Sequence, residues 1–197
     1  MSAKTSISEL DLICNQSHQA KIELRRSKKS KKDDALKYAA EFLILNKAKL
    51  IDANFIDMEL AHQKDLQDSF IDRLELNEKR IQSMISGLEK VINLDDPVGQ
   101  ITEPHTSPSG FEVSKMRVPL GVIGIIYESR PNVTADASAL CLKSGNACIL
   151  RGGSEAANSN AVIEDCMQKG LEKASLPKHS IQLIKNQDRK VVQEMIK

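Results

Sequence analysis

Proline and glycine are distributed unevenly along the chain. Residues 1–93 contain no proline and a single glycine, Gly87, and the first proline is Pro97. Because these two residue types break or weaken helices most strongly, the first half can form long uninterrupted helices. Its apolar side chains also recur at spacings of three and four residues, as one face of a helix requires. We predict helices near residues 6–27, 32–61 and 68–93.

Short apolar segments alternate with helical patterns beyond residue 118. The run at 122–127 is nearly all apolar, which is typical of a parallel strand buried on both faces. Residues 147–150 and 181–184 predict two further strands. A helical pattern follows each of the three, and Gly145 is expected to end the first of these helices. Strands that alternate with helices indicate a parallel sheet with crossover helices, and hence an α/β fold.

A stretch rich in threonine, proline, serine and glycine separates the helical half from the sheet. One strand is expected within it, over residues 111–118. We therefore divide the chain into an N-terminal helical segment at 1–93, a linker with the first strand at 94–117, and a partial α/β domain at 118–197.

Composition argues against nucleic-acid binding. Lys and Arg total 28 and Asp and Glu total 27, so a net charge of +1 gives no general attraction to nucleic acid or anionic membranes. Aromatic residues make up only 3%, too few for a surface on which bases stack. The basic run at 25–32 is interpreted as a solvated loop between helices, in preference to a phosphate-binding segment, because Asp33 and Asp34 follow it directly.

The longest apolar stretch is too short to cross a membrane. Residues 118–127 are about half of the roughly 20 residues that a membrane helix needs, and no secretory segment opens the chain. We expect a cytoplasmic protein whose four cysteines are reduced. The cysteines form no C-x-x-C pair and the four histidines are far apart, so no metal site is expected.

Ligands of parallel sheets bind at the carboxyl ends of the strands. The strand predicted at 122–127 ends in Tyr127, and Glu128, Ser129, Arg130, Pro131 and Asn132 follow. Asn132 could cap the following helix or donate an N–H to a developing oxyanion. Arg130 could pair with Glu128 or bind an anionic substrate through its planar guanidinium. The residues alone leave both alternatives open.

The second strand is followed by Arg151, Gly152, Gly153, Ser154 and Glu155, and the third by residues 185–188. Two glycines let a backbone approach a ligand closely, and the start of the following helix offers free N–H groups to an anion. Arg151 and Ser154 could bind a ribose phosphate, and Glu155 could accept hydrogen bonds from ribose hydroxyls. No G-x-G-x-x-G follows the first strand, so the usual phosphate-binding pattern of dinucleotide folds is missing.

Several long strings of the sequence are distinctive. They are RVPLGVIG at 117–124, YESRPNVT at 127–134, LCLKSGN at 140–146 and ILRGGSE at 149–155, with DRL at 72–74 and DPVG at 96–99 upstream. Together they closely resemble the gamma-glutamyl phosphate reductase family of the aldehyde dehydrogenase superfamily. The resemblance covers nearly the whole chain, and it implies an aldehyde dehydrogenase-like fold in which the helical segment precedes a partial Rossmann-like parallel sheet.

The resemblance implies an enzyme of proline biosynthesis. Its reaction would be the NADPH-dependent reduction of gamma-glutamyl phosphate to glutamate 5-semialdehyde with release of phosphate, the second step of that pathway. A cysteine thiolate attacks the acyl carbon in this superfamily, which requires oxyanion donors. Asn132 would be such a donor and Arg130 would contact the substrate. The residues expected to bind NADPH or NADP are Tyr127, Glu128, Arg151, Gly152, Gly153, Ser154 and Glu155.

The resemblance also implies partners. These are gamma-glutamyl phosphate itself, the glutamate 5-kinase that makes it, and further copies of the full-length chain in a homo-oligomer. Metal, nucleic acid and membrane are not expected as partners.

The chain departs from the family in one respect that bears on catalysis. Family members are about twice as long, and the nucleophilic cysteine has no counterpart here. Cys141, Cys148 and Cys166 lie among apolar neighbours and are expected to be core residues. We expect an amino-terminal part of a reductase, inactive by itself. The alternatives are a non-catalytic module that binds a nucleotide or a partner, and a basic helical protein that binds nucleic acid through residues 25–32.

Overall fold

The computed structural model describes residues 8–196. Its centre is a three-stranded parallel sheet in the order β3-β4-β5, formed by β3 (Val122–Ile126), β4 (Ala147–Arg151) and β5 (Ile181–Leu183). This arrangement confirms the α/β fold and all three predicted strands of the sheet.

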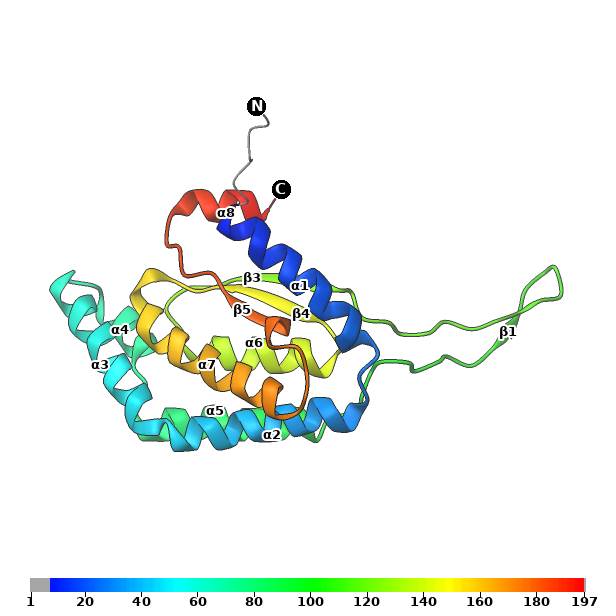
Figure 1. Ribbon diagram of the computed structural model, residues 1–197, viewed down its shortest axis with the longest axis horizontal. Coiled ribbons are helices and arrows are strands. Elements are labelled where there is room, and N and C mark those ends of the chain that lie inside the picture. Colours follow the sequence, from blue (N-terminus) through cyan, green and yellow to red (C-terminus); the bar gives the residue numbers. More distant parts are fainter. Residues whose placement is uncertain (1–7, 197) are drawn as a thin grey trace, which may run out of the picture.

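Helices cover both faces of this sheet (Figure 1). α1 (Glu9–Arg25) lies on one face, and α6 (Asn132–Lys143) and α7 (Ala157–Lys173) lie on the other. A further layer, formed by α2 (Lys29–Leu45) and α5 (Glu78–Ile92), packs on α6 and α7. The remaining helices are α3 (Lys47–Gln63), α4 (Asp68–Leu74) and α8 (Arg189–Met195), with short 3-10 turns at Ser154–Ala156 and Lys178–Ser180.

The parallel register places the carboxyl ends of β3 and β4 side by side. Ile126 pairs with Arg151, and the Tyr127 N–H donates to the Arg151 carbonyl at 3.1 Å. α6 connects the two strands and ends as predicted, because Gly145 adopts a φ of +74° that other residues avoid. The N–H groups of Gly145 and Asn146 then bond back to Leu142 and Cys141, as in a Schellman motif.

Two of the predicted N-terminal helices are each divided into two. The helix expected at 32–61 breaks at Asn46, whose side chain donates to the Phe42 carbonyl at 2.8 Å. The helix expected at 68–93 breaks between α4 and α5, where the Leu76 N–H donates to the buried Asn54 side chain at 2.7 Å. At Leu76 the side-chain hydrogen bond replaces a helical one, whereas at Asn46 it adds to the main-chain bond from the Asn46 N–H to the same Phe42 carbonyl. Periodicity of apolar residues reveals neither contact. The first helix begins at Glu9 behind the capping residue Ser8, and residues 6 and 7 of its predicted span lie outside the described residues.

The basic run at 25–32 matches the predicted solvated loop only in part, because residues 26–28 connect α1 to α2 and the run is largely exposed, but Lys32 is buried within a helix. Arg25 ends α1, and Lys32 lies in the first turns of α2 with 1% of its surface exposed. The Lys32 Nζ lies 2.7 Å from an Asp96 carboxylate oxygen and donates to the Lys143 carbonyl at 3.0 Å. The Lys143 Nζ in turn lies 2.6 Å from Asp33. The charges of this run therefore tie α2, α6 and the end of the helical half together.

The linker forms a long antiparallel arm instead of a strand of the sheet (Figure 1). β1 (His105–Thr106) pairs with β2 (Glu112–Val113), and Ile101 forms a further bridge with Met116. The strand predicted over 111–118 is therefore wrong in length, because it is regular only at Glu112–Val113 and pairs again only at the bridge of Met116. Its partner is the other side of the arm and not the central sheet. Within residues 8–196, the helices are all too short or too polar to cross a membrane.

One close helix contact joins the two halves of the chain. α2 crosses α7 at Gly170, where an added Cβ would lie 2.6 Å from the Ala35 carbonyl oxygen and 2.8 Å from the Ala39 Cβ. Side chains of both halves, including Leu36, Leu43, Leu88, Ile163 and Leu171, form one core around this crossing. The helical half is thus packed onto the crossover helices of the sheet.

We predict that Gly170→Ala lowers the free energy of unfolding by about 1–3 kcal/mol, because the added methyl group forces α2 and α7 apart. Gly87→Ala is the matched control, since this helical glycine would place its Cβ 3.3 Å from a single side-chain atom, Asp136 Oδ1. The control should be neutral or stabilising, because alanine favours helix by about 1 kcal/mol over glycine. Urea denaturation of both variants measures the difference, and equal stabilities would contradict the close-packing argument.

Candidate functional site

The two polar strand ends predicted from the sequence lie next to each other. The turn after β3 runs over residues 127–132, and the turn after β4 begins at Gly152. A methyl group on Gly152 would lie 3.1 Å from the Tyr127 ring. The parallel sheet therefore assembles one site from two segments that the sequence separates by more than twenty residues.

Asn132 does not cap α6. The N-cap position is Pro131, which makes no side-chain bond, and the first free N–H groups of the helix bond to the carbonyls of Arg130 and Pro131. The Asn132 Nδ2 instead donates to the Asp136 Oδ2 at 2.9 Å, one turn along the helix. Burial raises the pKa of Asp136, and this hydrogen bond partly offsets the effect. Of the two readings of Asn132, the capping role is wrong, and one N–H of its amide has no partner among the described residues.

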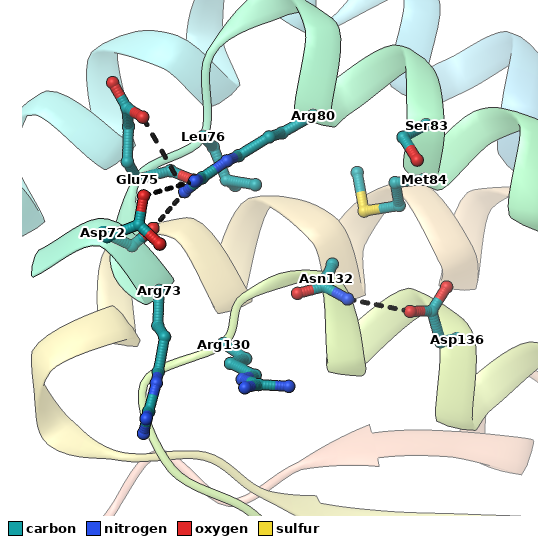
Figure 2. Close-up of a pocket in the computed structure, with 10 residues that line it drawn as sticks. All are labelled: Asp72, Arg73, Glu75, Leu76, Arg80, Ser83, Met84, Arg130, Asn132 and Asp136. Atoms are coloured by element: carbon teal, nitrogen blue, oxygen red, sulfur yellow. Dashed lines mark hydrogen bonds and ion pairs between the residues drawn. The ribbon is translucent and has the colours of Figure 1, made fainter. Parts of the chain in front are cut away.

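A cavity of about 320 Å³ opens beside Asn132, between α4, α5 and the turn after β3 (Figure 2). Both acidic and basic side chains line this cavity. The carboxylates of Asp72 and Glu75 both face Arg80, whose guanidinium lies 2.6 Å from an Asp72 oxygen and 3.7 Å from a Glu75 oxygen. The lining residues are Asp72, Arg73, Glu75, Leu76, Arg80, Ser83, Met84, Arg130, Asn132 and Asp136.

Arg130 contributes to this cavity without an internal partner. Its main-chain N–H donates to the Glu128 carbonyl at 2.8 Å, but its guanidinium makes no ion pair or hydrogen bond within residues 8–196. The pairing with the Glu128 carboxylate considered from the sequence is therefore not formed. Arg130 also lines an adjoining hollow of about 240 Å³, together with Arg73, Tyr127 and Glu128. Its charge is available to an anion.

Tyr127 links the turn after β3 to α7. Its hydroxyl lies 2.6 Å from the Thr134 hydroxyl, which donates to the buried Asn160 side chain at 2.8 Å. Burial is the main reason that the pKa of Tyr127 rises to about 12. The Tyr127 phenol thus stays protonated, and its hydrogen bond to Thr134 connects the turn after β3 with Asn160 of α7.

The glycines after β4 have a packing role. A Cβ on Gly152 would overlap the Asn160 Nδ2, so only glycine lets the backbone pass this close to the Asn160 side chain. On Gly153 it would lie 2.8 Å from the Glu155 Oε2, the end of a flexible side chain. Ser154 donates to the other Glu155 carboxylate oxygen at 2.8 Å, so the two side chains of this segment are held together.

The start of α7 is already occupied by a carboxylate. Asp57 of α3, 1% exposed, accepts hydrogen bonds from the main-chain N–H groups of Asn158 at 3.1 Å and Ser159 at 2.8 Å. The expectation that these N–H groups are free for an anionic ligand is therefore wrong. The sequence offered no signal for this contact, because Asp57 lies about a hundred residues earlier within a helix.

The ends of β4 and β5 nevertheless present unsatisfied polar atoms. The Arg151 guanidinium donates to the carbonyls of Gly152 at 3.2 Å and Gln187 at 3.1 Å. The Arg151 Nε and the Gln187 Oε1 are buried without a partner among the described residues. A cavity of about 180 Å³ lies here, lined in part by Gly152, Asn158, Asn160, Lys185 and Gln187. Buried polar atoms without partners beside a cavity fit a polar ligand such as a nucleotide.

The cysteines do not contribute to either cavity. Cys141, Cys148 and Cys166 are buried, as predicted, and Cys14 of α1 is exposed. Burial raises the pKa of the Cys166 thiol to about 11, and hydrogen bonding to Cys141 together with burial raises that of Cys148 further. Thiols held protonated in this way are poor nucleophiles.

Comparison with known proteins shows which family the chain resembles in sequence and fold. The chain is 47% identical over 191 residues to the gamma-glutamyl phosphate reductase of Clostridium beijerinckii, covering 97% of this chain and 46% of that protein. The crystal structure of gamma-glutamyl phosphate reductase from Thermotoga maritima matches with a TM-score of 0.92 and 42% identity, over 96% of this chain and 46% of that one. The corresponding Saccharomyces cerevisiae structure matches with a TM-score of 0.83 and 30% identity, over 92% of this chain and 47% of that one.

These matches confirm the resemblance inferred from the sequence strings. The chain spans slightly less than half the length of the relatives it matches. The model of the aldehyde dehydrogenase family matches residues 2–197. With its parallel sheet, its helical N-terminal half and its matching sequence, the chain belongs to the aldehyde dehydrogenase family.

Proposed function

We propose that this chain forms the substrate- and nucleotide-binding part of a cytoplasmic gamma-glutamyl phosphate reductase. That enzyme reduces gamma-glutamyl phosphate to glutamate 5-semialdehyde with NADPH and releases phosphate, as the second step of proline biosynthesis. The observation that carries the proposal is the cavity at the end of β3, where the unpaired Arg130 guanidinium and the Asn132 amide lie together in a chain 47% identical to such a reductase. An acyl phosphate needs both groups, one for its anionic charge and one for the oxyanion formed on attack.

Asn132 is proposed as the oxyanion donor. A carboxamide is a neutral donor that does not titrate, so it can face an alkoxide at any working pH. Its bond to Asp136 uses one of the two amide hydrogens and holds the side chain at the cavity wall (Figure 2). Because this bond fixes the amide, the second N–H of Asn132 keeps one orientation. A donor that is oriented before the reaction begins is the condition for preorganised stabilisation of a transition state.

NADPH is proposed to bind at the ends of β4 and β5, where it would supply a hydride. Arg151 and Ser154 would bind the 2′-phosphate, and Glu155 would accept hydrogen bonds from ribose hydroxyls. The partnerless Arg151 Nε supports this assignment, because a ligand acceptor would satisfy it. The backbone of Gly152 and Gly153 would border the nucleotide, with Tyr127 and Glu128 closing its side toward the substrate cavity.

Two partners belong to the same proposal. The glutamate 5-kinase would deliver the acyl phosphate, and further copies of a full-length chain would form a homo-oligomer. The arm supports the second, because it projects from the body with Phe111 and Met116 exposed by 72% and 58% of their surface. Apolar side chains on a projecting segment are typical of a contact between proteins.

A non-catalytic module that binds a nucleotide or a partner is the second candidate. It is favoured by one observation, namely that no cysteine among residues 8–196 lines either cavity. The nucleic-acid alternative is weakened, because Lys32 of the basic run is buried in an ion pair and Lys29 pairs with Asp33 at 2.6 Å, which leaves four exposed cations in the run.

We predict that the 197-residue chain alone does not reduce gamma-glutamyl phosphate and does not oxidise glutamate semialdehyde with NADP and phosphate. The physical reason is the absence of an accessible, activated thiol at the cavity. Turnover is followed by NADPH absorbance. Activity that disappears in Cys14→Ser, Cys141→Ser, Cys148→Ser or Cys166→Ser would identify a nucleophile within this chain and contradict the prediction.

Tests of individual residues need a full-length enzyme, made by joining this chain to the remaining half of the Clostridium beijerinckii reductase. In it, we predict that Arg151→Ala raises the KM for NADPH much more than it lowers kcat, since a contact to the adenosine end binds ground and transition states alike. Ser154→Ala should act in the same direction but more weakly, because a neutral hydrogen bond is weaker than a charge-assisted one. Equal effects with NADH, which lacks the 2′-phosphate, would argue against a phosphate contact.

Asn132→Ala in the same enzyme is expected to lower kcat about a hundredfold to a thousandfold, the usual effect of removing an oxyanion donor. Its melting temperature should stay near normal, because Asn132 caps no helix. Asn77→Ala is the matched control: Asn77 accepts the Arg80 N–H at the start of α5 and is a true cap. The control should lose about 0.5–2 kcal/mol of stability and retain its kcat. A near-normal kcat in Asn132→Ala would return the oxyanion role to main-chain N–H groups.

A further inference from the structure

Arg73 is the second cation of the substrate cavity that lacks an internal partner. It lies on α4, within the DRL string at 72–74 to which no role has been assigned above. Within residues 8–196 its guanidinium makes no ion pair and no hydrogen bond. It lines both the cavity of about 320 Å³ and the adjoining hollow of about 240 Å³, in each case together with Arg130. The two arginines therefore line the same two hollows from different elements, and their guanidinium groups extend in different directions (Figure 2).

Acidic and basic side chains balance in number along this cavity, but they are not paired evenly. Asp72 and Glu75 face Arg80, and Asp136 accepts the Asn132 amide (Figure 2). Arg73 and Arg130 are left as the two cations of the cavity without an ion-pair partner among residues 8–196, and the Glu128 carboxylate lines the adjoining hollow with them. Two guanidiniums, each with a planar set of donors, match a dianion with several acceptor oxygens better than a single carboxylate.

The backbone that carries Arg73 is held from two sides. The buried Asn54 of α3 donates to the Leu74 carbonyl at 2.9 Å and accepts the Leu76 N–H at 2.7 Å, so it bonds the chain immediately after Arg73. From outside, Arg80 donates to the main-chain carbonyls of Asp72 and Glu75. The main chain at residues 72–76 is therefore fixed by hydrogen bonds, while the Arg73 guanidinium itself has no partner among residues 8–196 and can meet a ligand.

We propose that Arg73 and Arg130 together bind the phosphate group of the acyl phosphate substrate. This inference rests on the proposed function and extends it to a residue on the helical half. The phosphate is bonded directly to the acyl carbon whose oxygen Asn132 would face, and Arg130 lies two residues from Asn132 in the same turn. The amino-acid end of the substrate carries an ammonium and a carboxylate, which sum to zero, and it leaves no charge for a second arginine to balance.

The reverse reaction of the full-length enzyme separates the phosphate from the amino-acid end of the substrate, because phosphate and glutamate 5-semialdehyde then enter as different molecules. Arg73→Ala is expected to raise the KM for inorganic phosphate about tenfold to a hundredfold, as loss of a charge-assisted contact does. The KM for the semialdehyde should change less than about twofold. Arg73→Lys should recover part of the phosphate affinity, since it restores a point charge without the planar fork.

Arg26→Ala is the control for the loss of one exposed positive charge, because Arg26 lies at the end of α1, away from this cavity. It should leave both KM values unchanged. If Arg73→Ala raises the KM of the semialdehyde instead, the arginine pair binds the carboxylate and the phosphate assignment is wrong. An active enzyme with unchanged KM values in Arg73→Ala would remove Arg73 from the site altogether.

A binding experiment on the 197-residue chain itself does not depend on catalysis. Inorganic phosphate should shift the side-chain Nε–H resonances of Arg73 and Arg130 together in NMR titrations, and Arg73→Ala should weaken the shift at Arg130. Shifts with glutamate but not with phosphate, or no shift of either resonance, would overturn the proposal. If the full-length enzyme shows no phosphate-dependent activity while phosphate still shifts both arginines, the proposed function fails and the anion site stands.

Discussion

The crossing of α2 over α7 is the contact on which the rest of the structure depends. Gly170 allows the α2 backbone to approach α7 so closely that a methyl group at this position would overlap the Ala35 carbonyl. The helical half then shares one hydrophobic core with the sheet and its crossover helices. α3 packs on α7 beside this crossing and carries α4, so the same packing places α4 and its Arg73 next to the turn after β3.

Buried polar contacts convert this packing into a precise arrangement. Asp57 caps the start of α7, and Asn54 bonds both the Ser159 hydroxyl and the main chain between α4 and α5. A buried carboxylate that lost these donors would leave its charge unpaired, which is strongly unfavourable. The same helix therefore fixes the crossover helix after β4 and the segment that carries Arg73. α3 therefore positions charged groups of the site, although none of its residues lines either cavity.

Much of the fold and part of the site could be predicted from local patterns. Apolar runs located β3, β4 and β5, and Gly145 marked the end of α6, because burial on both faces and a positive φ leave clear signals in sequence. Parallel strands then required residues 127–132 to lie beside residues 151–155. Periodicity did not reveal the breaks at Asn46 and Leu76, since an interrupted helix keeps its apolar spacing while side-chain hydrogen bonds of Asn46 and Asn54 form at the breaks.

The sequence by itself determined the family, the parallel sheet and the segments that border the cavities, because these depend on residues close together in the chain. Only the tertiary structure decided which charged side chains are paired with another group and which are left without a partner. It shows Lys32 buried against Asp96, Asp57 on the start of α7, and Arg73 and Arg130 facing one cavity without partners. The physical reason is that a charge is compensated or left free by groups that meet in space, and in this protein those groups come from helices up to about a hundred residues apart in the chain.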